Sequence, residues 1–213
     1  MHMTTSATRS GAKRGPYAKT ARRRAEIVEA ATSVFAARGY HGGSLRDIAR
    51  QIDLSFTSLV HHFPSKSDLL EAVLESADST ADWFGERARQ QGLKVAILEL
   101  VEINFSRAEL LRLLAIVSSE ASAPDHPAHS WFVARYENLT RAGESLILAD
   151  VAARRIRPVT NPLELARILI ATWDGLQLQW LLNPACDMLG EMSRAIDTLL
   201  PTADPGTSHA DGV

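Results

Sequence analysis

Cysteine and long apolar runs are scarce in this 213-residue chain. Cys186 is the single cysteine, so no internal disulfide can form, as is usual for proteins of the reducing cytoplasm. Its sequence neighbours include no cysteine or histidine of a zinc or redox motif. The richest apolar run, 110–117, is too short to span a bilayer and contains Arg112. The N-terminal residues lack the apolar segment of a signal peptide. We therefore expect a cytoplasmic protein with no membrane partner.

Catalytic motifs are also lacking. The chain has no nucleophile elbow, phosphate-binding loop or paired carboxylates at a catalytic spacing. Asp125, His126 and His129 come nearest to a metal site, but they lie at a predicted helix start, where capping and exposure are more common than ligation. The His61-His62 pair has no carboxylate close in sequence to orient an imidazole. We expect neither an enzyme nor a bound cofactor or metal.

Negative charge is sparse in the first third of the chain. Residues 1–66 hold 11 basic against 4 acidic residues, a net of +7, whereas residues 67–213 hold 12 against 21, a net of −9. The whole-chain charge of −2 conceals this division. A solvated basic face would explain the first segment by itself, but its position beside an acidic remainder favours a polyanionic partner for that segment only.

Two short predicted helices joined by a tight turn occupy residues 44–66. Ser44 is suited to cap the first helix, with Asp47 completing a capping box, and Ser55 is suited to cap the second. The turn falls at residues 53–54. The second helix, about 56–63, has few apolar anchors and an uncharged polar outer face, which suits the major groove of DNA.

The rest of the chain shows helical periodicity without clear strands, so we expect an all-α fold. Gly39 is a plausible end for the first helix, and Ser65, Pro127 and Asn161 mark the starts of later ones. The expected helices are about 20–38, 45–52, 56–63, 65–83, 93–105, 108–121, 127–155, 162–182 and 185–200.

Residues 20–75 resemble the N-terminal DNA-binding domain of TetR-family transcriptional repressors. The resemblance rests on Phe35 with the following Gly39-Tyr40, on Ile48-Ala49, and on the run from His62 to Lys66. It implies an N-terminal three-helix helix-turn-helix DNA-binding domain and a larger C-terminal helical domain for effector binding and dimerisation. The expected division is a disordered basic tail over 1–15, the DNA-binding domain over 16–66 with a connecting helix from 65, the helical domain over 67–200, and a disordered tail over 201–213.

The resemblance also implies which residues contact DNA. Thr57 and His61, one helical turn apart, are the best candidates for base edges, and Arg46 matches a position that reaches a base or phosphate. The other expected contacts are mainly to phosphates. The full set is Arg14, Lys19, Ser44, Arg46, Ser55, Phe56, Thr57, Ser58, Val60, His61, His62 and Lys66.

Two positions depart from the family pattern, and one segment precedes it. Val60 stands where the family usually has tyrosine, and Asp53 stands in the turn where a small residue is common. Residues 14–19 form a narrow basic arm that either follows the minor groove or acts as a charged tail that raises nonspecific affinity.

Aromatic and polar residues of the second domain are the candidates for an effector pocket, with helix-core packing as the alternative. The expected ligand contacts are Trp83, Glu102, Asn104, Phe105, Trp131, Phe132, Tyr136, Trp173 and Gln177. A stripe at helical spacing through 166–180, together with the last helix, suggests a dimeric four-helix bundle, with internal packing as the alternative. The expected interface residues are Ala166, Ile170, Trp180, Met192 and Ile196.

The leading hypothesis is therefore a homodimeric repressor that binds a pseudo-palindromic double-stranded DNA operator and is released by a small-molecule effector. The alternatives are a small all-α enzyme and a ligand-independent architectural DNA binder. Activity that survives loss of residues 1–66 would favour the enzyme, and DNA binding without sequence preference would favour the architectural protein.

Overall fold

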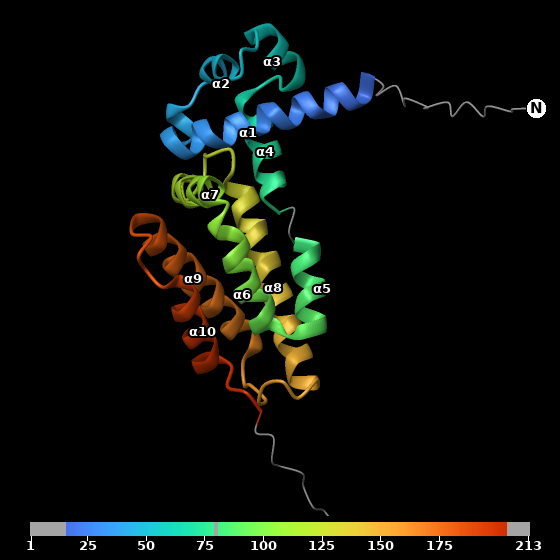
Figure 1. The fold of residues 1–213 in the computed structure, drawn as a ribbon, viewed down its shortest axis with the longest axis vertical. Coiled ribbons are helices and arrows are strands. Elements are labelled where there is room, and N and C mark those ends of the chain that lie inside the picture. Colours follow the sequence, from blue (N-terminus) through green and yellow to red (C-terminus); the bar gives the residue numbers. More distant parts are fainter. Residues whose placement is uncertain (1–15, 79–80, 204–213) are drawn as a thin grey trace, which may run out of the picture.

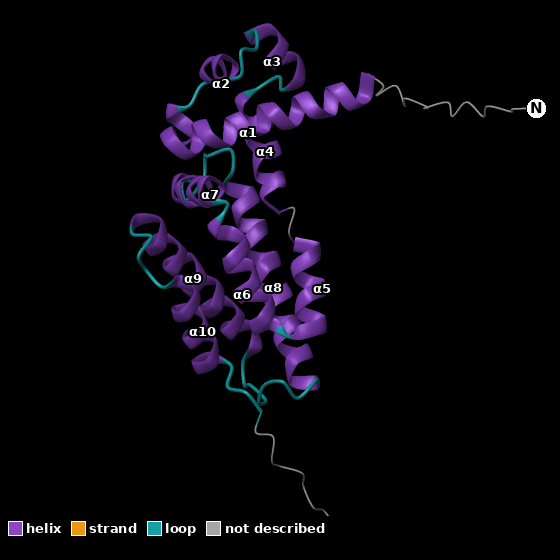
Figure 2. Ribbon diagram, viewed as in Figure 1, coloured by secondary structure: helices purple, strands orange, loops and turns teal. Residues whose placement is uncertain are grey.

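The fold consists of helices arranged in two tiers (Figures 1 and 2). The computed structural model describes residues 16–78 and 81–203. The N-terminal tier holds α1 (Pro16–Gly42), α2 (Leu45–Gln51), α3 (Phe56–His62) and α4 (Lys66–Ala77). The C-terminal tier holds α5 (Ala81–Gln91), α6 (Leu93–Phe105), α8 (His129–Ala152), α9 (Pro162–Leu182) and α10 (Met188–Leu199), and α7 (Ala108–Glu120) lies between the tiers. The all-α prediction is confirmed.

Local start and stop signals set most helix ends as the sequence predicts. Ser65 and Asp68 form a complete capping box at α4, and Asn161 accepts a hydrogen bond from the Glu164 N–H at α9. Gly39 has a φ of +70°, so the first helix breaks there and α1 continues only as a kinked last turn.

Several predicted boundaries are wrong, among them the end of α8, which lies at Ala152 and not at residue 155. The expected helix over 65–83 ends at Ala77, with Asp78 as its C-cap, and α5 is a separate helix. α8 begins at His129 because residues 123–128 form successive turns instead of a helix start at Pro127. α10 begins at Met188 because the Asp187 side chain accepts a hydrogen bond from the Gly190 N–H at 2.9 Å. α1 begins at Pro16, four residues before the predicted start.

The C-terminal end is ordered further than expected. The bridge between Ile156 and Thr202 is antiparallel, and the Arg157 N–H donates to the Pro201 carbonyl at 3.0 Å. Residues 201–203 therefore do not belong to the predicted loose tail, whose remainder lies outside the described residues, as does the predicted tail over 1–15.

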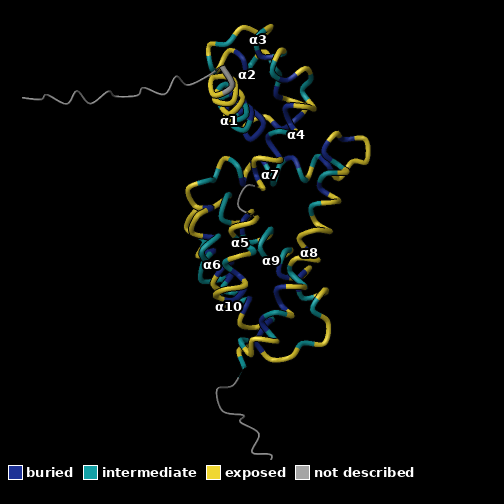
Figure 3. The backbone as a smooth tube through the Cα atoms, turned by 90° about the vertical axis from the view of Figure 1, so that its right-hand side faces the viewer, coloured by how far each residue is buried: buried dark blue, intermediate teal, exposed yellow. Residues whose placement is uncertain are grey.

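Each tier has its own apolar core, in which the buried segments gather (Figure 3). The N-terminal core combines the inner faces of α1–α4 with Leu113 and Val117 of α7 and with Phe132 at the start of α8. The expected boundary at residue 66 therefore does not divide the packing, because α7 and α8 complete the core of the N-terminal tier. The second core joins α5, α6 and α8–α10.

Candidate DNA-binding surface and ligand cavity

The short helix α3 is anchored from one side only. Leu59 and Phe63 are completely buried against the other helices of the N-terminal tier. Ser55 caps the helix by accepting a hydrogen bond from the Ser58 N–H at 3.1 Å. The opposite face of α3 is consequently presented at the end of the molecule, away from the C-terminal tier (Figure 1).

That outer face carries most of the residues expected to read bases. Phe56 is 44% exposed, and the guanidinium carbon of Arg46 lies 5.3 Å from its ring centroid, so α2 and α3 contribute to one surface. Thr57 and His61 are also exposed, whereas Ser58 and Val60 are half-buried. The two strongest base-reading candidates thus lie side by side, one turn apart, on an accessible face.

The turn before α3 depends on Asp53. Its φ is +50°, a left-handed conformation that favours glycine, and the next N–H, that of Leu54, donates to the Ala49 carbonyl at 2.9 Å. This explains why a small residue suits the position. Asp53 forms the turn with strain instead of changing its geometry.

Several residues expected at the phosphates have partners within the chain. The Ser44 hydroxyl donates to the Asp47 carboxylate at 2.7 Å. The predicted capping box is only half formed, because the Ser44 oxygen accepts the Asp47 N–H but Asp47 does not bind the Ser44 N–H. The Lys66 ammonium lies 4.3 Å from the Tyr40 ring centroid, and its pKa is lowered by burial. The pKa of His62 is also lowered, first by burial and then by neighbouring positive charges, so a neutral imidazole is favoured there.

The basic arm is only partly described. Lys19 is exposed on the first turns of α1, at the edge of the N-terminal tier. Arg14 lies outside the described residues, so the minor-groove prediction for the arm stays a prediction.

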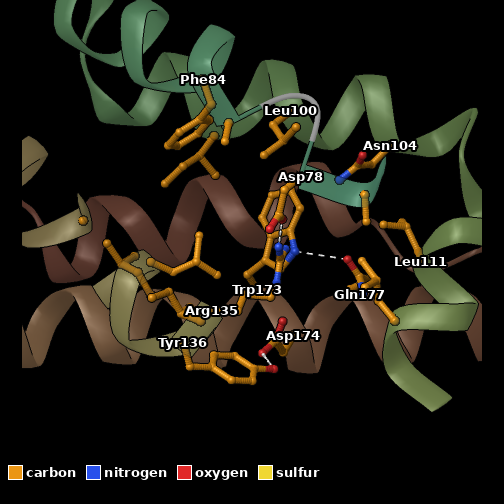
Figure 4. A pocket seen from close by; sticks show the side chains of 18 of the residues that line it. Asp78, Phe84, Leu100, Asn104, Leu111, Arg135, Tyr136, Trp173, Asp174 and Gln177 are labelled. Atoms are coloured by element: carbon orange, nitrogen blue, oxygen red, sulfur yellow. Dashed lines mark hydrogen bonds and ion pairs between the residues drawn. The ribbon is translucent and has the colours of Figure 1, made fainter. Parts of the chain in front are cut away.

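A cavity of about 550 Å³ lies in the C-terminal tier, enclosed by α6–α9 with contributions from the end of α4, α5 and α10. Five of the nine residues predicted from the sequence line it: Asn104, Phe132, Tyr136, Trp173 and Gln177. The Trp173 indole N–H donates to the Gln177 side-chain oxygen at 3.1 Å, a contact visible in Figure 4. The wall is therefore mainly apolar and aromatic, with a few fixed polar groups, as in pockets for small molecules.

The other four predicted residues lie elsewhere. Trp83 and Glu102 are exposed, and Phe105 packs on Trp180 with ring centroids 5.2 Å apart. Trp131 packs against the N-terminal core. On α6 only Asn104 of the three predicted residues turns inward, because residues 102 and 105 project from other sides of the helix.

Four charged residues that the sequence reasoning missed also line the cavity: Asp78, Arg107, Arg135 and Asp174. Arg135 forms an ion pair with Asp78, and the Tyr136 hydroxyl donates to Asp174 at 2.8 Å (Figure 4). Burial raises the pKa of Tyr136 to about 12 and also raises that of Asp174. The only sequence signal was that Arg135 and Asp174 each adjoin a predicted aromatic residue.

Most of the predicted dimer residues pack within the chain. Ala166, Met192 and Ile196 are buried in the core of the C-terminal tier, and Ile170 lines the cavity. A Cβ atom at Gly143 would lie 2.9 Å from the Ala166 Cβ, so α8 and α9 pack closely at this point. The Trp180 ring packs against the Phe105 ring. Ala166, Met192 and Ile196 are therefore covered within the chain, whereas Ile170 and Trp180 are half-buried, and the interface through these residues stays a prediction.

The opposite side of α9 is exposed and apolar. Its residues follow spacings of three and four and form what we call the α9 stripe: Ile168, Ala171, Gly175, Leu178 and Leu182. Leu178 and Leu182 are 49% and 79% exposed, and a Cβ atom at Gly175 would meet nothing within 4 Å. Leu178 also lies at the edge of the cavity. The α9 stripe has the form of a helix-packing surface for which the described residues provide no covering helix.

The candidate metal residues support a loop. His126 accepts a hydrogen bond from the Ala128 N–H at 3.1 Å, and the Nδ1 atom of His129 lies 2.9 Å from the Ala121 carbonyl oxygen. Over residues 16–78 and 81–203 no group of three or more potential metal ligands occurs. Within the same ranges no helix combines the length and the hydrophobicity needed to cross a bilayer.

Comparisons with known proteins match the N-terminal tier to a family and find relatives that are similar along most of the chain. Residues 27–73 match the family of bacterial regulatory proteins described as the tetR family. The chain is 26% identical over 185 residues to the HTH-type transcriptional regulator TtgR of Pseudomonas putida, covering 82% of this chain and 88% of that protein. It is also 26% identical over 186 residues to the A-factor receptor protein of Streptomyces griseus, covering 84% of this chain and 63% of the receptor.

The fold itself is shared with solved structures. A putative TetR-family transcriptional regulator from Rhodococcus sp. superposes with a TM-score of 0.70 at 21% identity, covering 84% of this chain and 99% of that one. The α3 surface, the family match and relatives similar along most of the chain lead to one conclusion: residues 27–73 form a DNA-binding domain of the tetR type, and the chain as a whole is similar to transcriptional regulators.

Proposed function

We propose that this protein is a repressor that binds a pseudo-palindromic operator as a homodimer and releases it when a small, mainly apolar effector occupies the cavity. The observation that carries the proposal is that some residues line the cavity and also pack in the N-terminal tier, which we here call the DNA-binding tier. Leu111, Leu114 and Phe132 face the cavity, and Phe132 also belongs to the N-terminal core, against which Leu114 packs. A ligand in the cavity therefore bears directly on the packing that positions α3.

Operator recognition is assigned to the outer face of α3. Thr57 and His61 would contact base edges, while Arg46, Lys19 and the backbone at the start of α4 would contact phosphates. The TtgR relative is named as a transcriptional regulator and the A-factor protein as a receptor, which supports DNA binding and ligand binding respectively.

Dimerisation is assigned to the α9 stripe, which replaces the interface predicted from the sequence. Two copies packed through this stripe would bury the exposed leucines and place two α3 helices to read two half-sites, about one helical turn of DNA or a multiple of it apart. A dimer is what a palindromic operator requires.

The proposal predicts a defined operator that depends on two side chains. Selection from a random duplex DNA pool with the intact protein should enrich an inverted repeat, because each protomer reads the same half-site. Thr57→Ala and His61→Ala should each relax or change the preferred base at one position per half-site, at a cost of about 1–3 kcal/mol. Gln91→Ala, at an exposed position of α5, is the control and should select the wild-type repeat.

Failure to enrich any sequence at low salt, with folded protein free of bound ligand, would refute the proposal. Enrichment of a single half-site without the repeat would refute its dimeric part. Once the operator is known, compounds that fit the cavity are screened for release of a fluorescent operator duplex, and the proposal requires that some of them release it.

A further inference from the structure

Two guanidinium groups line the cavity, those of Arg107 and Arg135, and the second forms an ion pair with a carboxylate that also lines it. Arg135 projects from α8 with a side chain that is 21% exposed. Burial lowers its pKa, yet a guanidinium titrates so high that it stays charged at every pH at which the protein is folded. A cation on a mainly apolar wall requires an anionic partner to offset the cost of its desolvation.

Asp78 provides that partner in this structure. Among the described residues it is the only carboxylate that forms an ion pair with Arg135, and its own side chain is 43% exposed (Figure 4). Asp78 is also the C-cap of α4. A carboxylate at this end of a helix faces the negative end of the helix dipole, so the position of Asp78 depends on Arg135 for compensation.

Asp174, the other carboxylate close to Arg135, has a different environment. It accepts a hydrogen bond from Tyr136, whose raised pKa of about 12 keeps the phenol protonated and able to donate. Burial raises the pKa of Asp174, so its negative charge is disfavoured. Asp174 is thus already hydrogen-bonded to Tyr136, whereas the carboxylate that balances Arg135 is Asp78, whose side chain is 43% exposed.

The ion pair has a direct mechanical link to the DNA-binding tier. The last turn of α4 reaches the cavity wall through Ala77 and Asp78. Earlier in the same helix, Leu69, Leu70 and Val73 are buried in the N-terminal core. α4 is only 12 residues long, so a change at its C-terminal end is transmitted over about three turns to the helices that hold α3.

We propose that the effector is an amphipathic carboxylate, an alkyl or aryl acid whose carboxylate takes Arg135 from Asp78 while its apolar part fills the cavity. This inference rests on the proposed function and names the chemical class of its effector. A guanidinium binds a carboxylate through two parallel hydrogen bonds, which an alcohol or an amine cannot reproduce. Asp78, left without its partner at the end of α4, then no longer holds that end against the cavity wall, and the DNA-binding tier shifts.

The test compares matched compounds that differ only in the head group. Calorimetric titration of the full-length protein uses phenylbutyrate, phenylbutanol and phenylbutylamine, and then decanoate, decanol and decylamine. Wild-type protein should bind the acids about tenfold or more tightly than the alcohols, as expected for a charge-assisted hydrogen bond. The variants are Arg135→Gln and Asp78→Asn, with Arg141→Gln as control because Arg141 is on the same helix, is exposed and forms its ion pair with Glu137, outside the cavity wall.

The two variants should act in opposite directions. Arg135→Gln should abolish the preference for acids. Asp78→Asn should tighten acid binding several-fold, because the competing carboxylate has been removed, and should weaken operator binding without ligand. Arg141→Gln should behave as the wild type. A merely structural role of either residue would not produce this reversal of sign, and circular dichroism establishes that each variant is folded.

Several results would overturn the inference. They are acids that bind no more tightly than alcohols, a preference for amines, no binding of either acid, or a preference for acids that persists in Arg135→Gln. The proposed function fails separately, through the absence of a selected operator or of any compound that releases it. If an alcohol or an amine releases the operator, the proposed function stands and the carboxylate inference is wrong.

Discussion

His126 is a buried histidine whose imidazole packs edge-on against the rings of Tyr40 and His41 in the last part of α1. Its side chain is 1% exposed, its Nδ1 accepts the Ala128 N–H, and its Nε2 has no hydrogen-bond partner among the described residues. The charged and titratable groups around it are Glu120 at 3.9 Å, His41, Asp125 and Lys66. Burial is the largest influence and lowers the pKa of His126, despite the attraction of Glu120. The neutral form is therefore the one that the fold accommodates.

This burial predicts a loss of stability in acid. Above pH 6.5 the histidine is neutral in both states, so its contribution is complete. As the pH falls from 6.5 towards the lower folded pKa, the unfolded chain takes up a proton that the folded protein resists, and the free energy of unfolding decreases by at most about 1.4 kcal/mol per pH unit.

Urea denaturation across this pH range measures the effect of His126. The variant His126→Gln should show a smaller decrease than the wild type. Gln91→Ala, at an exposed position that carries no titratable group, should retain the wild-type slope. Identical slopes for His126→Gln and the wild type would show that His126 does not titrate on unfolding.

At the scale of elements, the turn between α2 and α3 determines how the recognition helix is presented. Asp53 adopts a φ of +50° there, and the strain of a left-handed residue is greatest for β-branched side chains. Asp53→Val should lower the free energy of unfolding by about 1–2 kcal/mol. Asp53→Gly should be neutral or stabilising by up to about 1 kcal/mol, because the relief of strain is offset in part by the entropy of glycine in the unfolded chain.

Chemical denaturation of the two Asp53 variants provides the measurement, and operator affinity provides a second readout. Asp53→Gly should retain sequence-specific binding because the turn geometry is unchanged. Equal stabilities of the valine and glycine variants would mean that the residue does not hold a left-handed conformation in solution.

α7, which lies between the two tiers, completes the core of the N-terminal tier. Glu120, at its end, accepts the Tyr40 N–H at 2.8 Å, just where the positive φ of Gly39 interrupts α1 and frees that group. Leu113 and Val117 of the same helix are buried in the N-terminal core. The sequence predicted α7 as a Leu-rich amphipathic helix, but the identity of its packing partner required the tertiary structure.

At the scale of the whole molecule, the α9 stripe predicts that assembly and DNA binding fail together. Leu178→Glu places a charge on the exposed apolar face, so two copies can no longer bury it without desolvating the carboxylate. Sedimentation equilibrium should show a monomer with an unchanged circular dichroism spectrum, and affinity for the inverted repeat should fall by about a hundredfold or more as the second half-site is lost.

Leu148→Glu is the matched control, since Leu148 is a similarly exposed leucine on α8. It should leave both the dimer and the operator affinity unchanged. Dimerisation that survives Leu178→Glu would remove α9 from the interface.

The sequence by itself determined the helices, the short helix α3 with its polar outer face, and the tetR-type pattern of residues 27–73, because their signals are local. Capping residues such as Ser55 and Ser65, the break at Gly39, and the spacing of Leu59 and Phe63 each act within a few residues. The fold class and the exposed face of α3 followed directly from such patterns.

Only the tertiary structure decided which face of each long helix points inward. α9 is apolar nearly all round, so periodicity did not distinguish the stripe through Ala166 and Ile170, which packs inside the chain, from the exposed one through Leu178. The pairing of Asp78 with Arg135 and of Tyr136 with Asp174 joins residues far apart in the sequence. Such contacts are set by how the helices cross, which no local signal encodes, and they are the contacts from which the effector class is proposed.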